Sequence, residues 1–193
     1  PLYSALHRPA ARRPRRLFTL LGGTLAHLDH EPRFLQHSLV DCDVNDLLLL
    51  DVPLACAPCT DRAEIKRRDR LFAEGVPAPY CAWLAGPLWR YCPQVEQVDF
   101  HWDLETHCPV PGSYALHAIA TVVCSQGADR QFSLLRLGRY DPAQLAKCLS
   151  EIGWEELGAE LYSGEHSLRL YRKRSAGPRA GSGGTQGWEG KLG

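Results

Sequence analysis

A glycine pair followed by a hydroxyl and an imidazole is the segment of the sequence best suited to chemistry. Gly22 and Gly23 allow a ligand to approach the backbone closely, and the hydroxyl of Thr24 stands beside them. His27 is placed to accept a proton from an amine, because imidazole exchanges protons near neutral pH. A structural His27, hydrogen-bonded at the start of a helix, is the alternative. Asp51 ends a later apolar run and either faces an amine or caps the next loop.

A zinc site would be a different use of the polar residues. Cys56 and Cys59 have the two-residue spacing of a metal knuckle, and His27 and His30 lie three apart. A structural zinc ion needs four ligands, usually from two such pairs, and no second cysteine pair has this spacing. A redox pair would open a helix after a first strand, which is not the context here. We therefore expect loop thiols and no metal site.

The elements around the glycine pair are predicted to be a strand, a helix and a second strand. Residues 17–21 and 47–52 are apolar runs typical of strands buried on both faces of a parallel sheet. Between them, residues 29–39 predict a helix that begins near Asp29 and buries Phe34 on its apolar face. A strand, a helix and a strand in this order indicate a right-handed crossover, the unit of a doubly wound α/β sheet.

The rest of the chain predicts strands mixed with helices. Asp141 is expected to be the N-cap of the last helix, which Gly153 ends. A proline-rich, lid-like stretch is expected after the helix predicted over residues 61–72 and up to residue 88. Residues 154–161 are expected only to be a segment that connects the last helix to the last strand. The strands are predicted over residues 95–104, 114–124, 132–137 and 167–171, and the helices over 61–72 and 143–152.

The balance of charge and hydropathy excludes several partners. The 22 basic and 22 acidic side chains give no net charge, so neither nucleic acid nor a membrane surface is expected as a partner. No apolar stretch approaches the roughly 20 residues of a membrane helix, and no signal peptide is apparent, so the cytoplasm is the expected location. The eight cysteines are expected to be thiols of a reducing compartment.

Two stretches resemble the histidine-specific methyltransferase family, which includes the enzyme that trimethylates histidine on the way to ergothioneine. Residues 16–29, followed by 46–52, resemble that family's fourth strand, its turn of the form Leu-Gly-Ser-Thr-Ile-Gly-Asn, a helix and its fifth strand. Residues 139–142, Arg-Tyr-Asp-Pro, resemble the Tyr-Asp-Pro start of its last helix. Together the two stretches span roughly residues 16–174.

The resemblance implies a class I methyltransferase that uses S-adenosyl-L-methionine and methylates a small, amino-acid-like amine. Of the sheet order 3-2-1-4-5-7-6, this chain would hold the partial Rossmann-like half 4-5-7-6. The implied cofactor-binding residues are Gly22, Gly23 and Thr24, and the substrate-binding residues are expected to be Asp51, Trp83, Trp89 and Tyr140. His27 is the candidate catalytic residue on its own chemistry, not through the resemblance. Ordinary packing is the alternative for Tyr140, and core or a protein interface for the tryptophans.

The sequence departs from the family pattern at the acceptor site. Ala26 and His27 replace a glycine and an asparagine, and the expected Glu-x-Ser before the Tyr-Asp-Pro motif falls at Leu135 to Leu137. Histidine is therefore not carried over as the substrate. Nothing before Arg16 supplies the glycine-rich donor loop or its acidic partner residue.

These features predict three segments. Residues 1–15 are expected to be a flexible or truncated segment, 16–174 the C-terminal half of a methyltransferase domain, and 175–193 a disordered, low-complexity tail. Because the chain opens at Pro1 and holds no methionine, we expect the donor-binding half to be lost upstream. The alternative is a non-catalytic interaction subunit or half-domain that pairs with a partner chain.

Overall fold

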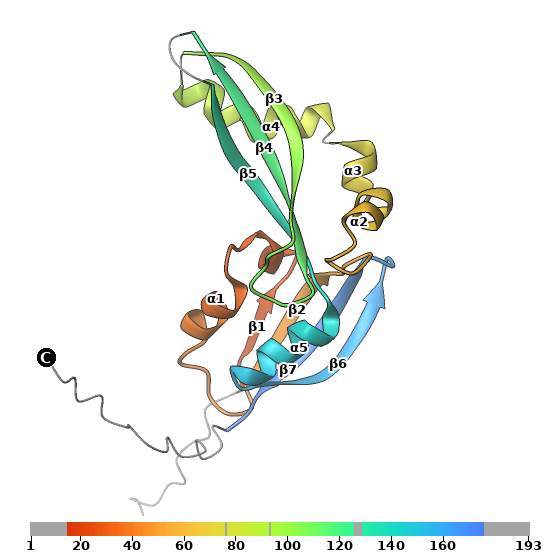
Figure 1. Cartoon of the computed structure of the whole chain (residues 1–193). Helices are drawn as coiled ribbons and strands as arrows, with labels where there is room; N and C mark the ends of the chain where they lie inside the picture. Colours follow the sequence, from red (N-terminus) through yellow and green to blue (C-terminus); the bar gives the residue numbers. More distant parts are fainter. Residues whose placement is uncertain (1–14, 76, 93, 126–128, 176–193) are drawn as a thin grey trace, which may run out of the picture.

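The chain forms two sheets with helices around them (Figure 1). A computed structural model describes residues 15–75, 77–92, 94–125 and 129–175. The predicted flexible N-terminal segment lies outside the described residues apart from residue 15, as does the predicted tail from residue 176 on. Among the described residues, no helix is long and apolar enough to cross a membrane.

The first sheet has four strands in the order β1-β2-β7-β6. Their bounds are Leu17–Leu20 for β1, Leu47–Pro53 for β2, Trp154–Tyr162 for β6 and His166–Lys173 for β7. β1 and β2 are parallel, whereas β7 runs antiparallel to both of its neighbours. This is the order predicted for the 4-5-7-6 half. The chain is therefore a mixed α/β fold, and its doubly wound, Rossmann-like character stays a prediction.

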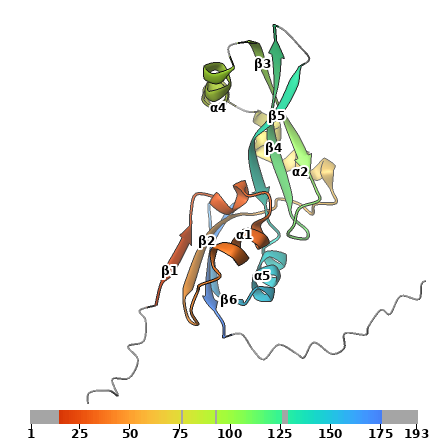
Figure 2. The ribbon, with the colours of Figure 1, turned by 90° about the vertical axis from the view of Figure 1, so that its left-hand side faces the viewer.

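Two helices cover one face of this sheet (Figure 2). The connection from β1 to β2 contains a short 3-10 helix, η2, at Thr24–His27, and α1 at Glu31–Ser38; the second covering helix is α5, at Pro142–Glu151. Leucines of α1, β2 and α5 share one core with Trp154 and Tyr171. The run at residues 47–52 forms a buried strand because this helical layer removes one of its faces from water. The run at residues 17–21, predicted to be buried on both faces, instead forms an edge strand whose residues alternate between exposed and half-buried.

The start of α1 differs from the prediction. His30, not Asp29, is its N-cap, and the ring of His30 accepts a hydrogen bond from the backbone N–H of Arg33 at 3.3 Å. Phe34, expected on the apolar face, is exposed, because the core of the helix is formed by Leu35 and Leu39 instead. An aspartate one residue too early cannot reach the first free N–H groups of the helix.

The second sheet projects from the first as an arm, which we define as residues 55–139 (Figure 1). Its strands, in the order β3-β4-β5, are Val95–Glu105, Tyr114–Cys124 and Arg130–Arg139. Its helices are α2 at Arg62–Arg68, α3 at Arg70–Glu74 and α4 at Ala78–Tyr91. A second core joins α2 to the base of this sheet and is built around Ile65, Leu104, Tyr114 and Leu116.

The arm corrects two sequence predictions. The single helix expected over residues 61–72 is broken at Asp69, whose backbone is extended and whose carboxylate caps α3 by accepting from the N–H of Leu71 at 3.0 Å. The lid-like stretch up to residue 88 is helix α4, because Pro79 lies in its first turn, where proline is tolerated. Residues 154–161, expected only to carry the chain across, belong to strand β6.

The last helix follows its sequence signals. The carboxylate of Asp141 accepts hydrogen bonds from the backbone N–H groups of Ala143 and Gln144 at 2.9 and 3.0 Å, so the predicted N-cap is confirmed. Gly153 follows the helix with a φ of 87°, a left-handed conformation that favours glycine.

The arm leaves and rejoins the first sheet at one point. Leu54 and Tyr140 form an isolated parallel β-bridge. The N–H of Ala55 donates to the carbonyl of Tyr140, and the N–H of Tyr140 donates to the carbonyl of Pro53, both at 3.0 Å. The two ends of the inserted segment are thus hydrogen-bonded to each other.

Candidate functional site

The glycine pair forms a left-handed turn at the carboxyl end of β1. Gly22 and Gly23 have φ values of 65° and 70°. A Cβ added at Gly22 would have no atom within 4 Å, so this side of the turn is open to a ligand. A Cβ at Gly23 would lie 3.6 Å from the ring of Pro53, so the second glycine contacts β2 instead. The predicted close approach to the backbone is possible at Gly22 only.

The hydroxyl hydrogen of Thr24 is engaged in a hydrogen bond within the protein. Its hydroxyl donates to the carbonyl of Leu21 at 2.5 Å, in the turn itself. The hydroxyl oxygen can therefore act toward a ligand only as an acceptor, through its lone pairs.

Asp51 supports the glycine turn from the neighbouring strand. One carboxylate oxygen accepts from the N–H of Gly22 at 3.0 Å, and the other accepts from the hydroxyl of Tyr162 at 2.6 Å and from the ring of His166 at 3.1 Å. Burial raises the pKa of Asp51, but these hydrogen bonds outweigh it and the pKa lies below its usual value. Asp51 lies inside β2 and holds the turn, so a contact with an acceptor amine stays a prediction.

Asp51→Asn is expected to lower the free energy of unfolding at pH 7 by about 1–3 kcal/mol, because three donors lose an ionised acceptor. The folded-state pKa is lower than that of an unfolded aspartate, about 3.9. The stabilisation is thus complete above about pH 4 and disappears as the pH falls through the folded-state value. Urea unfolding at several pH values measures this difference. Glu160→Gln, at an exposed position of β6, is the control; a difference that does not shrink as the pH falls below about 4 would contradict the assignment.

His27 follows the turn and is exposed, with one ring nitrogen occupied. Its Nδ1 lies 2.8 Å from the carbonyl oxygen of Arg136. A carbonyl only accepts, so Nδ1 carries the hydrogen and Nε2 keeps a lone pair. This geometry satisfies the structural interpretation of His27 and also leaves a proton acceptor on the same ring.

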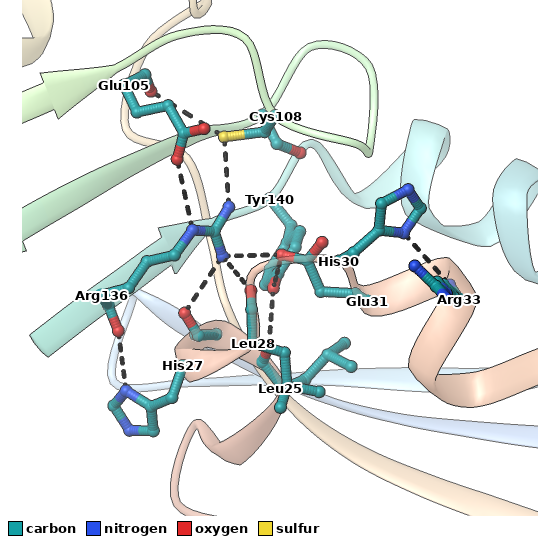
Figure 3. A network of polar contacts seen from close by, with 12 residues as sticks. Leu25, His27, Leu28, His30, Glu31, Arg33, Glu105, Cys108, Arg136 and Tyr140 are labelled. Atoms are coloured by element: carbon teal, nitrogen blue, oxygen red, sulfur yellow. Dashed lines mark hydrogen bonds and ion pairs between the residues drawn. The ribbon is translucent and has the colours of Figure 1, made fainter. Parts of the chain in front are cut away.

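Arg136 is the centre of a buried polar network between the arm and η2 (Figure 3). Its Nη1 donates to the backbone carbonyls of Ala26 and Leu28 and to the carboxylate of Glu31 at 2.9 Å. The side chains of Arg136 and Glu31 are only 5% and 1% exposed. Burial lowers the pKa of Arg136, but the charge of Glu31 outweighs it and the pKa is raised. The guanidinium thus fixes both ends of the segment that carries His27.

Tyr140 belongs to the same network. Its hydroxyl donates to Glu31 at 2.7 Å and lies 3.1 Å from the carbonyl of Leu25. Burial and the neighbouring carboxylate raise its pKa. Tyr140 therefore packs under η2, as in the packing alternative, and its predicted role in binding a substrate stays a prediction.

The network continues along the polar face of the arm. Glu105 lies 3.3 Å from Nε of Arg136 and 3.0 Å from Nε2 of His117, whose Nδ1 is 3.0 Å from the hydroxyl of Ser133. Cys108 lies 3.5 Å from Nη2 of Arg136, and burial raises the pKa of its thiol to about 11, so it stays protonated near neutral pH. These residues form a continuous polar chain from η2 onto the arm.

The structure gathers some of the predicted site residues and separates others. The glycine turn, Asp51 and His27 lie together, whereas Trp83 and Trp89 are exposed on α4, along the outer part of the arm (Figures 1 and 2). Sequence reasoning missed Arg136 and Glu31. The one signal was a charged residue between two leucines, Leu135 and Leu137, within a predicted strand.

The described residues contain no group of three or more histidine, cysteine or acidic side chains that could hold a metal ion. Cys56 and Cys59 are free thiols, and Sγ of Cys56 lies 3.1 Å from the hydroxyl of Tyr114.

Comparison with known proteins gives a weak structural likeness. No family model matches the chain, and no curated protein matches it in sequence. The chain is similar in structure to an S-adenosylmethionine-dependent methyltransferase from Clostridium acetobutylicum ATCC 824, with a TM-score of 0.40 and 8% identity over 83% of this chain. It spans 60% of the length of that protein. The resemblance to the histidine-specific family finds no support here and stays a prediction.

Proposed function

We propose that the chain is the acceptor-side half of an S-adenosyl-L-methionine-dependent methyltransferase that acts on a small-molecule amine. One observation carries the proposal: an open, left-handed glycine turn at the carboxyl end of a strand in a β1-β2-β7-β6 sheet. In open α/β sheets, ligands bind beyond the carboxyl ends of the strands. β1 also has a free edge among the described strands, with Leu17 56% exposed, as a missing neighbouring strand would leave it.

The residues present fit one wall of the cofactor site. Gly22 leaves room for a ligand above the backbone, and Thr24 keeps an acceptor lone pair. The described strands include none on the far side of β1, where a donor-binding loop would stand. When bound, S-adenosyl-L-methionine supplies an electrophilic methyl group. We therefore expect this chain alone to bind the cofactor weakly.

The remaining chemistry belongs to the chain's own residues. Nε2 of His27 accepts a proton from the acceptor amine, because the Arg136 carbonyl holds Nδ1–H and leaves the Nε2 lone pair on an exposed ring. Asp51 keeps the Gly22 backbone in place, and Arg136 holds the backbone carbonyls on either side of His27. Alignment of the two reacting centres is the main requirement for methyl transfer, so a rigid turn suits the reaction.

The alternative is a non-catalytic half-domain that pairs with a partner chain. The free edge of β1 favours it, since a partner strand would cover the exposed Leu17. Under this alternative the glycine turn binds no ligand. The titration described next therefore distinguishes the two functions.

Titration of the isolated chain with S-adenosyl-L-methionine, followed by amide NMR, tests the proposal. We expect millimolar binding, with shifts at Gly22, Gly23, Thr24 and His27, that Gly22→Val abolishes. The matched control is Gly164→Val, a second left-handed glycine with open space around it. Low-micromolar affinity by calorimetry would contradict the half-site, and shifts that avoid the turn would contradict the methyltransferase function.

A further inference from the structure

Helix α4 is apolar on its outer side as well as on its inner side. Its 14 residues include one charged residue, Arg90. Its inner side packs on β3, with Ala85 buried and Leu84 and Leu88 beside it. A helix that is apolar all round is normally buried on all sides. We therefore expect the outer side of α4 to be covered by a partner.

Two tryptophans dominate the outer side. Trp83 is 69% exposed and Trp89 is 48% exposed, and the ring of Tyr80 stacks on Trp83 with centroids 5.5 Å apart. Exposed apolar patches of this kind mark interaction surfaces, and tryptophan is the residue type most enriched among binding hot spots. The patch lies on the outer part of the arm, away from the glycine turn (Figures 1 and 2).

The arrangement of these residues is self-complementary. Trp83 and Trp89 lie three residues before and three residues after Gly86, about 4.5 Å along the helix axis on either side. A Cβ added at Gly86 would have no atom within 4 Å, so another backbone can approach there. If two copies of α4 cross antiparallel at Gly86, Trp83 of one copy lies level with Trp89 of the other on both sides of the crossing.

The nearly neutral charge of the exposed side of α4 favours a second copy of the helix as the partner. The exposed side of α4 presents no acidic residue, and its one base, Arg90, lies over the ring of Tyr91 at 5.7 Å. A charged partner would have no opposite charge to meet, whereas a second α4 is equally neutral and apolar. Two-fold pairing of one patch with itself is also the commonest form of protein association.

We propose that α4 is the interface of a homodimer of this chain, with two helices packed antiparallel across Gly86. A few aromatic side chains of roughly 150–250 Å² each give less than the ~800 Å² per partner of a standard interface. We therefore expect a weak dimer that involves no residue of the glycine turn.

Sedimentation equilibrium of the chain over a range of concentrations tests the proposal. We expect a concentration-dependent dimer and a blue shift of tryptophan fluorescence as it forms. Gly86→Lys places a charge at the crossing. Because Gly86 precedes Pro87, where a Cβ strains the helical backbone, circular dichroism must show the helix of this variant intact, and Trp83→Gln, at a 69% exposed position, separates loss of the dimer from loss of the helix. We expect Gly86→Lys to weaken the dimer at least tenfold, and Trp83→Gln to weaken it as well.

Two controls make the outcome decisive. Leu161→Gln, at an exposed apolar position of β6, should leave the dimer unchanged. Leu17→Lys places a charge on the free edge of β1. A monomer at every soluble concentration overturns the proposal. So does a dimer that Leu17→Lys dissociates but Gly86→Lys does not, because the copies would then meet at β1.

Discussion

Arg136→Met is expected to lower the free energy of unfolding by about 3–5 kcal/mol, because it leaves the buried carboxylate of Glu31 without its charge partner. Oε2 of Glu31 has no hydrogen-bond partner among the described residues, and Oε1 would keep only the hydroxyl of Tyr140. The carbonyls of Ala26 and Leu28 would also lose a donor. Urea denaturation followed by circular dichroism measures the loss.

Arg172→Met is the matched control. Arg172 pairs with Glu155 at 2.8 Å, but both side chains are more than a third exposed, so we expect a loss of only about 0–1 kcal/mol. If the two variants lost equal stability, the buried network would not be the anchor of η2. The double variant Arg136→Met/Glu31→Leu should recover part of the loss, because no unpaired charge remains in the interior.

Gly138→Ala is expected to cost about 1–3 kcal/mol and to displace η2 from the arm. The added Cβ would lie 2.9 Å from the hydroxyl of Tyr140 and 3.3 Å from Cα of Ala26. The tyrosine cannot turn away, because its hydroxyl is held by Glu31. The backbone must therefore shift, and amide NMR should show changes at Ala26 and His27.

The control for this substitution is another strand glycine. A Cβ at Gly158, in β6, would have no atom within 4 Å, so Gly158→Ala should change stability by less than about 0.5 kcal/mol. If Gly138→Ala were equally neutral, the close approach of β5 to η2 would not constrain the position of His27.

Local chemistry accounts for what could be predicted from the sequence. The apolar runs that form β1 and β2, and the Asp141 cap of α5, depend on neighbouring residues only. The order of the four strands came from the family resemblance. Helix α4 was missed because prolines at two of its positions suggested a loop, although one lies in the first turn, where no N–H is lost.

The polar network could not be predicted because its partners are distant in sequence. Arg136 and Glu31 lie 105 residues apart, and only the return of β5 to the first sheet brings them together. The same holds for Asp51, whose partners Tyr162 and His166 are more than 100 residues further on. A carboxylate at a strand position suggests a ligand contact, but folding can equally supply internal donors for it.

The bridge between Leu54 and Tyr140 makes the chain a host sheet with a guest module inserted into it. Because the two ends of the guest already touch in the host, its length adds only a slowly growing loop-closure entropy to the folding of the sheet. The guest can therefore lengthen, shorten or change its outer surface while the host keeps its strand order. The ion pair of Arg136 with Glu31, the close approach of Gly138 to Ala26 and the place of Val110 in the first core tie the sequence of one to that of the other.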